Sequence, residues 1–221
     1  MPQWPNRANL GAAWLRKLSW TAFHVASIGF FLARLLSEYV KVYEDTLSPE
    51  RCQALIDRFE AAPALHERTP AERAFKFVEL NVSQHWPDVE KQIFGIMMSC
   101  IHRYWETLGV GPYWPKKVDL EKVRLKRYLP DGGDRFPPHV DVMNSEESRR
   151  FLTAILYLNR PGGGETIFPS LDMSVSPAPG RMVIFPPLWN FPHAGQPPRD
   201  RPKYILHRYL WYPSPNEGAS G

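Results

Sequence analysis

The chain has 221 residues, of which 43% are hydrophobic, 23% charged and 13% aromatic. This composition is typical of a globular protein with one main domain, and it excludes intrinsic disorder for the bulk of the chain. The net charge is +4, and all four excess positive charges lie in residues 1–37, so residues 38–221 are formally neutral. A body without net positive charge is not typical of nucleic-acid-binding proteins, and we expect no nucleic-acid partner.

Residues 1–37 differ from the rest of the chain because they are basic, apolar and free of acidic groups. Their stretch 18–33 contains no Asp, Glu, Lys or Arg, but its 16 residues are fewer than the roughly 20 of a typical membrane-spanning helix. We interpret the segment first as a helix packed on the domain. The alternatives are a signal or other targeting sequence and a helix that makes peripheral contact with a membrane surface.

Residues 38–120 are predicted to be mostly helical. One helix begins with Ser48 as its N-cap, followed by a proline, a combination typical of helix N-termini. A second helix is expected over about residues 89–108, where apolar residues recur at helical spacing. Cys52 and Cys100 lie in these helices and belong to no CxxC or zinc motif. We therefore expect buried free thiols, a reducing compartment and a cytoplasmic location.

Residues 121–213 are predicted to form short strands, because β-prone runs alternate with glycine- and proline-rich turns such as PDGGD and RPGGG. Helices followed by strands favour an α+β arrangement in which the helices pack on one side of a β-sandwich or barrel. We treat residues 38–213 as a single domain, mostly β with N-terminal helices, and residues 214–221 as a tail.

Two histidines and one aspartate stand out within this β-rich region. His139 and Asp141 are two positions apart in a predicted strand, so their side chains are expected on the same face. His193 comes later, just before the last predicted strand, and Lys203 follows it by ten positions. Two imidazoles and one carboxylate are the ligand set of non-heme Fe(II) oxygenases, in which three coordination positions stay open for chemistry.

The segment 122–211 resembles the 2-oxoglutarate- and Fe(II)-dependent dioxygenases, most closely their prolyl-4-hydroxylase-like branch. The resemblance is carried, in the family's order, by the stretches RLKRYLPDGGDRFPPHVDV, FLTAILYLN, GGETIFP, PGRMVIFPP, HAGQP and PKYILHRYLWY. It implies a double-stranded β-helix, which is a jelly-roll of the cupin type, with supporting helices on one sheet. Residues 1–37 have no counterpart in the family.

The resemblance also implies roles for individual residues. His139, Asp141 and His193 would bind the iron, and Lys203 would pair with the distal carboxylate of 2-oxoglutarate. Three further residues are expected in the cosubstrate site: Tyr157 as a hydroxyl donor to that carboxylate, Tyr128 in the pocket wall, and Thr153 as an added hydrogen-bonding group.

Two further residues of the last predicted strand, Arg208 and His207, bear on the role of Lys203. Arg208 is the alternative anchor for the carboxylate, although strand alternation places it on the opposite face from Lys203. His207 shares the face of Lys203 and is expected to be a packed strand histidine, with a pocket residue as the alternative. The arginines at positions 135, 149 and 150 lie in loops beside the predicted site, where we expect solvated charges balanced by Glu146 and Glu147. The alternative is a basic rim that attracts an acidic substrate.

The implied reaction is the oxidative decarboxylation of 2-oxoglutarate to succinate and CO₂, coupled to hydroxylation of an unactivated C–H bond. It requires Fe(II), 2-oxoglutarate and O₂, and ascorbate is a further candidate cofactor. The intact Asp141 favours hydroxylation, because related halogenases carry a small residue at this position. The substrate is expected to be a peptidyl proline or a small molecule. The alternatives are a non-catalytic cupin-like module that binds a metal or ligand, and a membrane-surface or partner-docking protein whose functional part is residues 1–37.

Overall fold

The computed structural model describes residues 36–130, 134 and 136–214. The description leaves out residues 1–35 of the N-terminal segment and residues 215–221 of the tail. The predicted packing, targeting and membrane contact of the first segment therefore stay predictions. Among the described residues, no helix combines the length and the apolar character that crossing a membrane requires.

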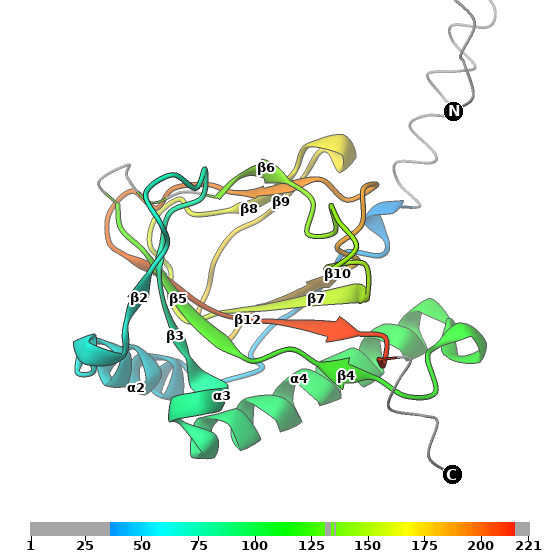
Figure 1. Ribbon diagram of the computed structural model, residues 1–221, viewed down its shortest axis with the longest axis horizontal. Helices are drawn as coiled ribbons and strands as arrows, with labels where there is room; N and C mark the ends of the chain where they lie inside the picture. The colour runs from blue at the N-terminus through cyan, green and yellow to red at the C-terminus, as the bar shows by residue number, and fades with distance from the viewer. Residues whose placement is uncertain (1–35, 131–133, 135, 215–221) are drawn as a thin grey trace, which may run out of the picture.

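The larger of two antiparallel sheets forms the centre of the domain (Figure 1). Its strand order is β1-β10-β7-β12-β5-β3-β2, and β4 pairs with one end of β12. The strands are β1 (Lys41–Tyr43), β2 (Glu67–Arg68), β3 (Val78–Asn81), β4 (Asp119–Leu120), β5 (Arg124–Tyr128), β7 (Arg150–Tyr157), β10 (Met182–Phe185) and β12 (Lys203–Trp211).

The smaller sheet faces the larger one from the other side of the barrel (Figure 1). Its strand order is β6-β11-β8-β9, and all of its pairs are antiparallel. The strands are β6 (Phe136–His139), β8 (Thr166–Phe168), β9 (Met173–Val175) and β11 (His193–Gly195). Two facing sheets confirm the predicted double-stranded β-helix.

Helices cover the outer face of the larger sheet (Figure 1). The α-helices are α2 (Pro49–Glu60), α3 (Val82–His85) and α4 (Pro87–Leu108), and short 3-10 turns occur at Pro63–Leu65, Gly111–Tyr113 and Pro169–Leu171. The hydroxyl of Ser48 accepts a hydrogen bond from the backbone N–H of Arg51, as expected of an N-cap. Helix α4 ends at Gly109, whose φ of +64° is the left-handed conformation that glycine adopts without strain.

Strand alternation divides the core into two parts. Side chains such as Leu125, Leu156 and Leu206 point toward the helices and join Phe59 and Ile93 in one hydrophobic cluster. Alternate residues of the same strands point into the barrel, where a second cluster forms around the large aromatic side chains Tyr157, Phe168 and Phe185. The cysteines of α2 and α4 are free and buried, as predicted.

The region 38–120 is less helical than predicted. It contributes β1 to one edge of the larger sheet, and β2 and β3 to the other. These segments are two to four residues long, too short for their side-chain periodicity to be distinguished from that of a helix or loop. Pairing with β10 and β5 holds them in the sheet.

Candidate active site

The two histidines of the predicted triad face each other across a pair of strands. His139 is the last residue of β6, and it is the register partner of His193, the first residue of β11. Asp141 was expected in the same strand as His139, but β6 ends before it and Asp141 lies in a bend. The bend still brings its carboxylate to the histidines, and one ligand atom from each residue lies within 4.8 Å of the others.

The carboxylate of Asp141 is held by several contacts in a buried position, where only 7% of the residue is exposed. The hydroxyl of Tyr209 donates to Oδ1 over 2.7 Å, and the hydroxyl of Thr153 donates to Oδ2 over 3.3 Å. Burial raises the pKa of Asp141, but the contact with His139 and the nearby charge of His193 outweigh it, so the pKa lies well below its usual value. The carboxylate is therefore ionised at neutral pH.

Backbone carbonyl groups fix the orientation of both imidazoles. Nδ1 of His139 lies 2.8 Å from the carbonyl oxygen of Pro137, and Nδ1 of His193 lies 3.1 Å from that of Phe191. A carbonyl oxygen can only accept, so each Nδ1 carries a proton and donates to it, and each Nε2 faces the carboxylate of Asp141. The Nε2 atoms lie 3.3 and 3.5 Å from the oxygens of Asp141.

The donor atoms of this triad fit a divalent metal ion. Nε2 of His139 is buried and makes no hydrogen bond to any described residue, which would be unfavourable unless another group takes its lone pair. Burial lowers the pKa of His193, and a neutral imidazole is the form that binds metal. Two such imidazoles and an ionised carboxylate suit Fe(II) and leave room for further ligands.

One cavity is lined both by the triad and by Lys203. Lys203 is the first residue of β12, and only 3% of it is exposed. Its Nζ donates to the carbonyl oxygen of Gly164 over 3.1 Å and lies 4.7 Å from the centre of the Tyr128 ring. Burial lowers the pKa of Lys203 to about 8. Lys203 and Tyr128 both line the cavity, together with Thr166.

Two predicted cosubstrate residues hydrogen-bond to side chains that line the cavity. Tyr157 is fully buried, and its hydroxyl donates to the hydroxyl oxygen of Thr166 over 2.6 Å. Thr153 donates to Asp141 and braces the triad. Thr166, which sequence reasoning missed, itself lines the cavity. Its signal was its position in GGETIFP, two positions after the last glycine of the turn.

Arg208 and His207 of β12 have opposite surroundings. The guanidinium of Arg208 pairs with Glu90 of α4 and donates to the carbonyl oxygen of Glu121, so it contacts the helical side of the sheet. His207 was expected to be a packed strand residue, but its side chain lines the cavity. Burial lowers the pKa of His207 well below its usual value, so its ring is neutral at physiological pH.

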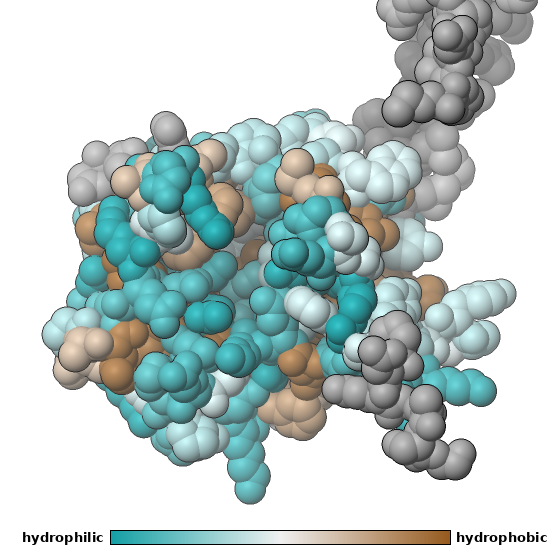
Figure 2. All heavy atoms as spheres, viewed as in Figure 1, coloured by the Kyte–Doolittle hydropathy of each residue, from teal (hydrophilic) through white to brown (hydrophobic). Residues whose placement is uncertain are grey.

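A groove outside the triad opens the site to the surface. Figure 2 shows the hollow on this face, lined mainly by hydrophilic side chains. The predicted charge balance holds in part at its rim, because Arg150 pairs with Glu147 and with Glu121, whereas Arg149 pairs with Asp119. Residue 135 lies outside the described part of the chain.

Comparisons with known proteins agree with this geometry. Residues 123–211 match the model of the 2OG-Fe(II) oxygenase superfamily. No curated protein matches the chain significantly. Among solved structures, a viral collagen prolyl hydroxylase of Paramecium bursaria Chlorella virus-1, in its 2-oxoglutarate complex, has 21% sequence identity and a TM-score of 0.57; the match covers 80% of this chain and 97% of that one.

Two further prolyl hydroxylases share the fold. The prolyl-4-hydroxylase of Pseudomonas putida has 18% identity and a TM-score of 0.59, over 83% of this chain and 100% of its own. A prolyl hydroxylase of Trichoplax adhaerens, solved with a peptide of a hypoxia-inducible factor, has 15% identity and a TM-score of 0.59, over 87% and 93% of the two chains. Residues 123–211 thus match the 2OG-Fe(II) oxygenase superfamily, the domain has the fold of the prolyl hydroxylases, and these likenesses together with the triad indicate an enzyme of the Fe(II)- and 2-oxoglutarate-dependent dioxygenase type.

Proposed function

We propose that this dioxygenase hydroxylates an unactivated C–H bond of a peptide or small-molecule substrate and releases succinate and CO₂. His139, Asp141 and His193 would hold Fe(II), and Lys203 would anchor 2-oxoglutarate. The observation that carries the proposal is one cavity with a metal-binding triad at one end and a buried ammonium at the other. A dicarboxylate with a keto group next to one carboxylate suits both ends.

The chain's contribution at the metal end is to hold the three ligands in one geometry. The carbonyl groups of Pro137 and Phe191 hold both imidazole rings so that their Nε2 atoms face the carboxylate. Tyr209 and Thr153 use one carboxylate oxygen each, so the Asp141 side chain cannot rotate freely. Fe(II) bound here supplies O₂ activation, driven by electrons from the decarboxylation of 2-oxoglutarate.

At the other end the chain supplies charge and hydroxyl groups for the distal carboxylate. The Lys203 ammonium is a compact charge that suits a single buried carboxylate. The Thr166 hydroxyl accepts from Tyr157, so its own hydrogen is free to point into the cavity. The Tyr128 ring covers the ammonium and excludes water from it. A carboxylate paired here would be anchored more strongly than in water.

The substrate class and the location of the protein remain part of the proposal. The Trichoplax neighbour, solved with a peptide, supports a peptidyl proline, whereas the short groove described above also suits a small molecule. The free thiols of Cys52 and Cys100 support a cytoplasmic location. Peripheral membrane contact through residues 1–37 is proposed only as an accompanying feature.

An anaerobic titration tests the proposed chemistry. The purified protein is titrated with Fe(II) and then with 2-oxoglutarate while the visible charge-transfer band of the chelate is recorded; O₂ is then admitted and succinate is measured. We expect the band, followed by slow succinate release. The variant His193→Ala should lose both, and His102→Ala should keep both because His102 is an exposed residue of α4. A folded, metal-loaded protein without the band would refute the proposal and favour a binding module.

A further inference from the structure

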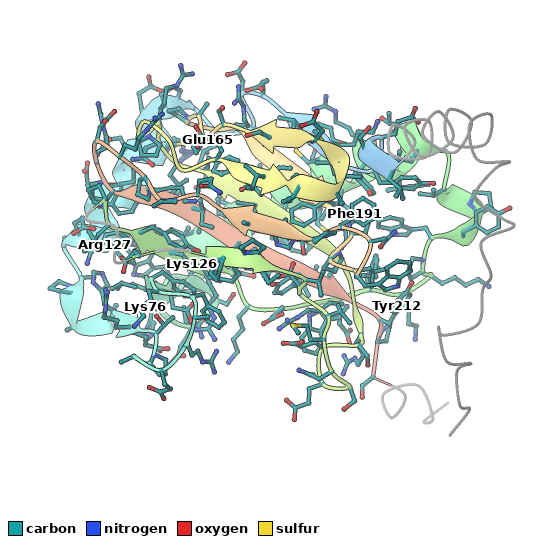
Figure 3. All side chains as sticks on the ribbon, turned by 90° about the horizontal axis from the view of Figure 1, so that it is seen from above. Lys76, Lys126, Arg127, Glu165, Phe191 and Tyr212 are labelled. Carbon is teal, nitrogen blue, oxygen red and sulfur yellow. The ribbon has the colours of Figure 1, made fainter. Side chains whose placement is uncertain are left out.

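Lys126 is a second buried lysine in the barrel, and neither the triad nor the proposed cosubstrate anchor uses it. It lies in the middle of β5, where its register partner is Ile205 of β12. Its side chain lines both the inner cavity and the outer groove, and only 12% of that side chain is exposed. Figure 3 shows Lys126 toward the middle of the molecule, whereas its neighbour Arg127 lies nearer the edge.

The ammonium of Lys126 lacks a close acceptor. The nearest carboxylate is that of Glu79, whose Oε2 lies 4.0 Å away, beyond hydrogen-bonding distance, while the other oxygen of Glu79 lies 3.4 Å from Arg124. No described residue accepts a hydrogen bond from Nζ, although an ammonium has three N–H groups to donate. Burial lowers the pKa of Lys126, as expected for a cation that is desolvated without full compensation.

Aromatic rings form the apolar wall of the groove beside this ammonium. The rings of Phe75 and Phe136 stack with centres 5.0 Å apart, and the ring of Phe77 lies 5.8 and 5.9 Å from the other two. Nζ of Lys126 lies 4.6 Å from the centre of the Phe77 ring. A cation with free donors beside an apolar wall, and next to the metal-binding triad, fits a ligand with an anionic group and an apolar body.

Lys126 is distinct from the proposed anchor Lys203. Lys203 lies opposite Tyr128, two positions further along the sheet, and its ammonium already has the carbonyl oxygen of Gly164 as an acceptor. Lys203 lines only the inner cavity, whereas Lys126 lines both the inner cavity and the outer groove. Two lysines at different depths can therefore serve two different anions, one from the cosubstrate and one from the substrate.

We propose that Lys126 binds a carboxylate of the substrate, and that the substrate is a small acid with an apolar body that packs on Phe75, Phe77 and Phe136. This assignment rests on the proposed function, because it places the substrate beside the same triad. It favours a small carboxylic acid over a peptidyl proline, whose neighbouring groups are neutral amides.

The test uses the full chain loaded anaerobically with Fe(II) and saturating 2-oxoglutarate. The probes are 3-phenylpropionate, L-leucine and L-proline, each paired with its primary amide, and the readouts are a shift of the charge-transfer band and the stimulation of succinate release by O₂. The variants are Lys126→Met and the control Lys91→Met, which removes an exposed lysine of α4. Binding of 2-oxoglutarate to each variant is measured separately from the same band.

We expect at least one carboxylate to shift the band and stimulate succinate release, while its amide does neither. Lys126→Met should weaken that response by roughly 30-fold or more, since removing one partner of a buried charged pair has effects of this size. The charge-transfer band should still form with 2-oxoglutarate in Lys126→Met, because the proposed anchor Lys203 is intact, and Lys91→Met should change nothing.

Three results would overturn the assignment without touching the proposed function. These are an equal response to acids and amides, no response to any of the carboxylates, and a loss of 2-oxoglutarate affinity in Lys126→Met. The last would make Lys126 part of the cosubstrate site. Failure of the proposed function would look different, because the wild-type protein itself would then show neither the band nor succinate.

Discussion

Replacing Lys203 by Met should abolish the binding of 2-oxoglutarate and at the same time stabilise the protein without ligands. Burial lowers the pKa of Lys203 from 10.5 to about 8. A shift of this size means that the charged form destabilises the folded state by about 3 kcal/mol at neutral pH. We expect Lys203→Met to raise the free energy of unfolding by up to about 3 kcal/mol at pH 7.

The pH dependence of this difference has a definite sign. A lysine whose pKa is lowered on folding destabilises the protein fully below its folded pKa, near 8. The destabilisation disappears as the pH rises toward the unfolded value of about 10.5. The cost should therefore shrink from about 3 kcal/mol at pH 7 to about 1 kcal/mol at pH 10, and the stability difference between the two proteins should shrink with it.

Urea unfolding of both proteins at pH 7 and pH 10, without metal or cosubstrate, measures the difference directly. Isothermal titration calorimetry with 2-oxoglutarate, in the presence of Fe(II) under anaerobic conditions, measures whether the variant still binds the cosubstrate. A variant that is destabilised at pH 7, or a stability difference that does not change with pH, would show that the ammonium is already well compensated in the apo-protein. A variant that still binds 2-oxoglutarate would remove Lys203 as the anchor.

Three further predictions concern the same strand, β12. The affinity of the wild-type protein for 2-oxoglutarate should fall about tenfold per pH unit above about 8, because Lys203 then loses its proton; anaerobic titrations between pH 7 and 9.5 check this, and a flat profile would contradict it. Tyr209→Phe removes a hydrogen bond to Asp141 and should weaken Fe(II) binding by about 10- to 100-fold, measured by competition with a chelator; unchanged iron affinity would exclude a bracing role. Arg208→Leu breaks the ion pair with Glu90 and should destabilise the fold by about 3 kcal/mol in urea, with 2-oxoglutarate affinity retained; a specific loss of that affinity would restore Arg208 as the anchor.

The residues of the triad could be found from sequence because their signal is local. The spacing of His139 and Asp141 and the turn that carries His193 are features of short segments, and so is the N-cap of α2. The expectation that one strand carries both residues was only partly right, because β6 ends at His139 and Asp141 lies in the bend that follows. A two-residue spacing does not distinguish a strand from a tight bend that brings the same two side chains together.

The hydrogen-bond partners of side chains inside the barrel could not be predicted from periodicity. The resemblance predicted Tyr157 and Thr153 near the cosubstrate, but their hydrogen-bond partners come from other segments, namely Thr166 of β8 and Asp141. A single sequence contains no information about which strands oppose each other. Lys126 was overlooked for a related reason, because a charged residue in an alternating strand is usually interpreted as facing solvent.

The position of β12 has a consequence for how the enzyme folds. This strand lies between β7 and β5 and also pairs with β4, so it joins segments that are far apart in the sequence. Until it inserts, β5 and β7 are two unpaired edges, which are prone to aggregation, and such long-range pairing is slow. Strand β12 also carries Lys203 and Tyr209. A chain in which β12 has not yet paired would therefore lack both the proposed anchor for 2-oxoglutarate and the hydrogen bond from Tyr209 to Asp141. Completion of the sheet and maturation of the site are therefore a single folding event, and a partly folded but partly active species is not expected.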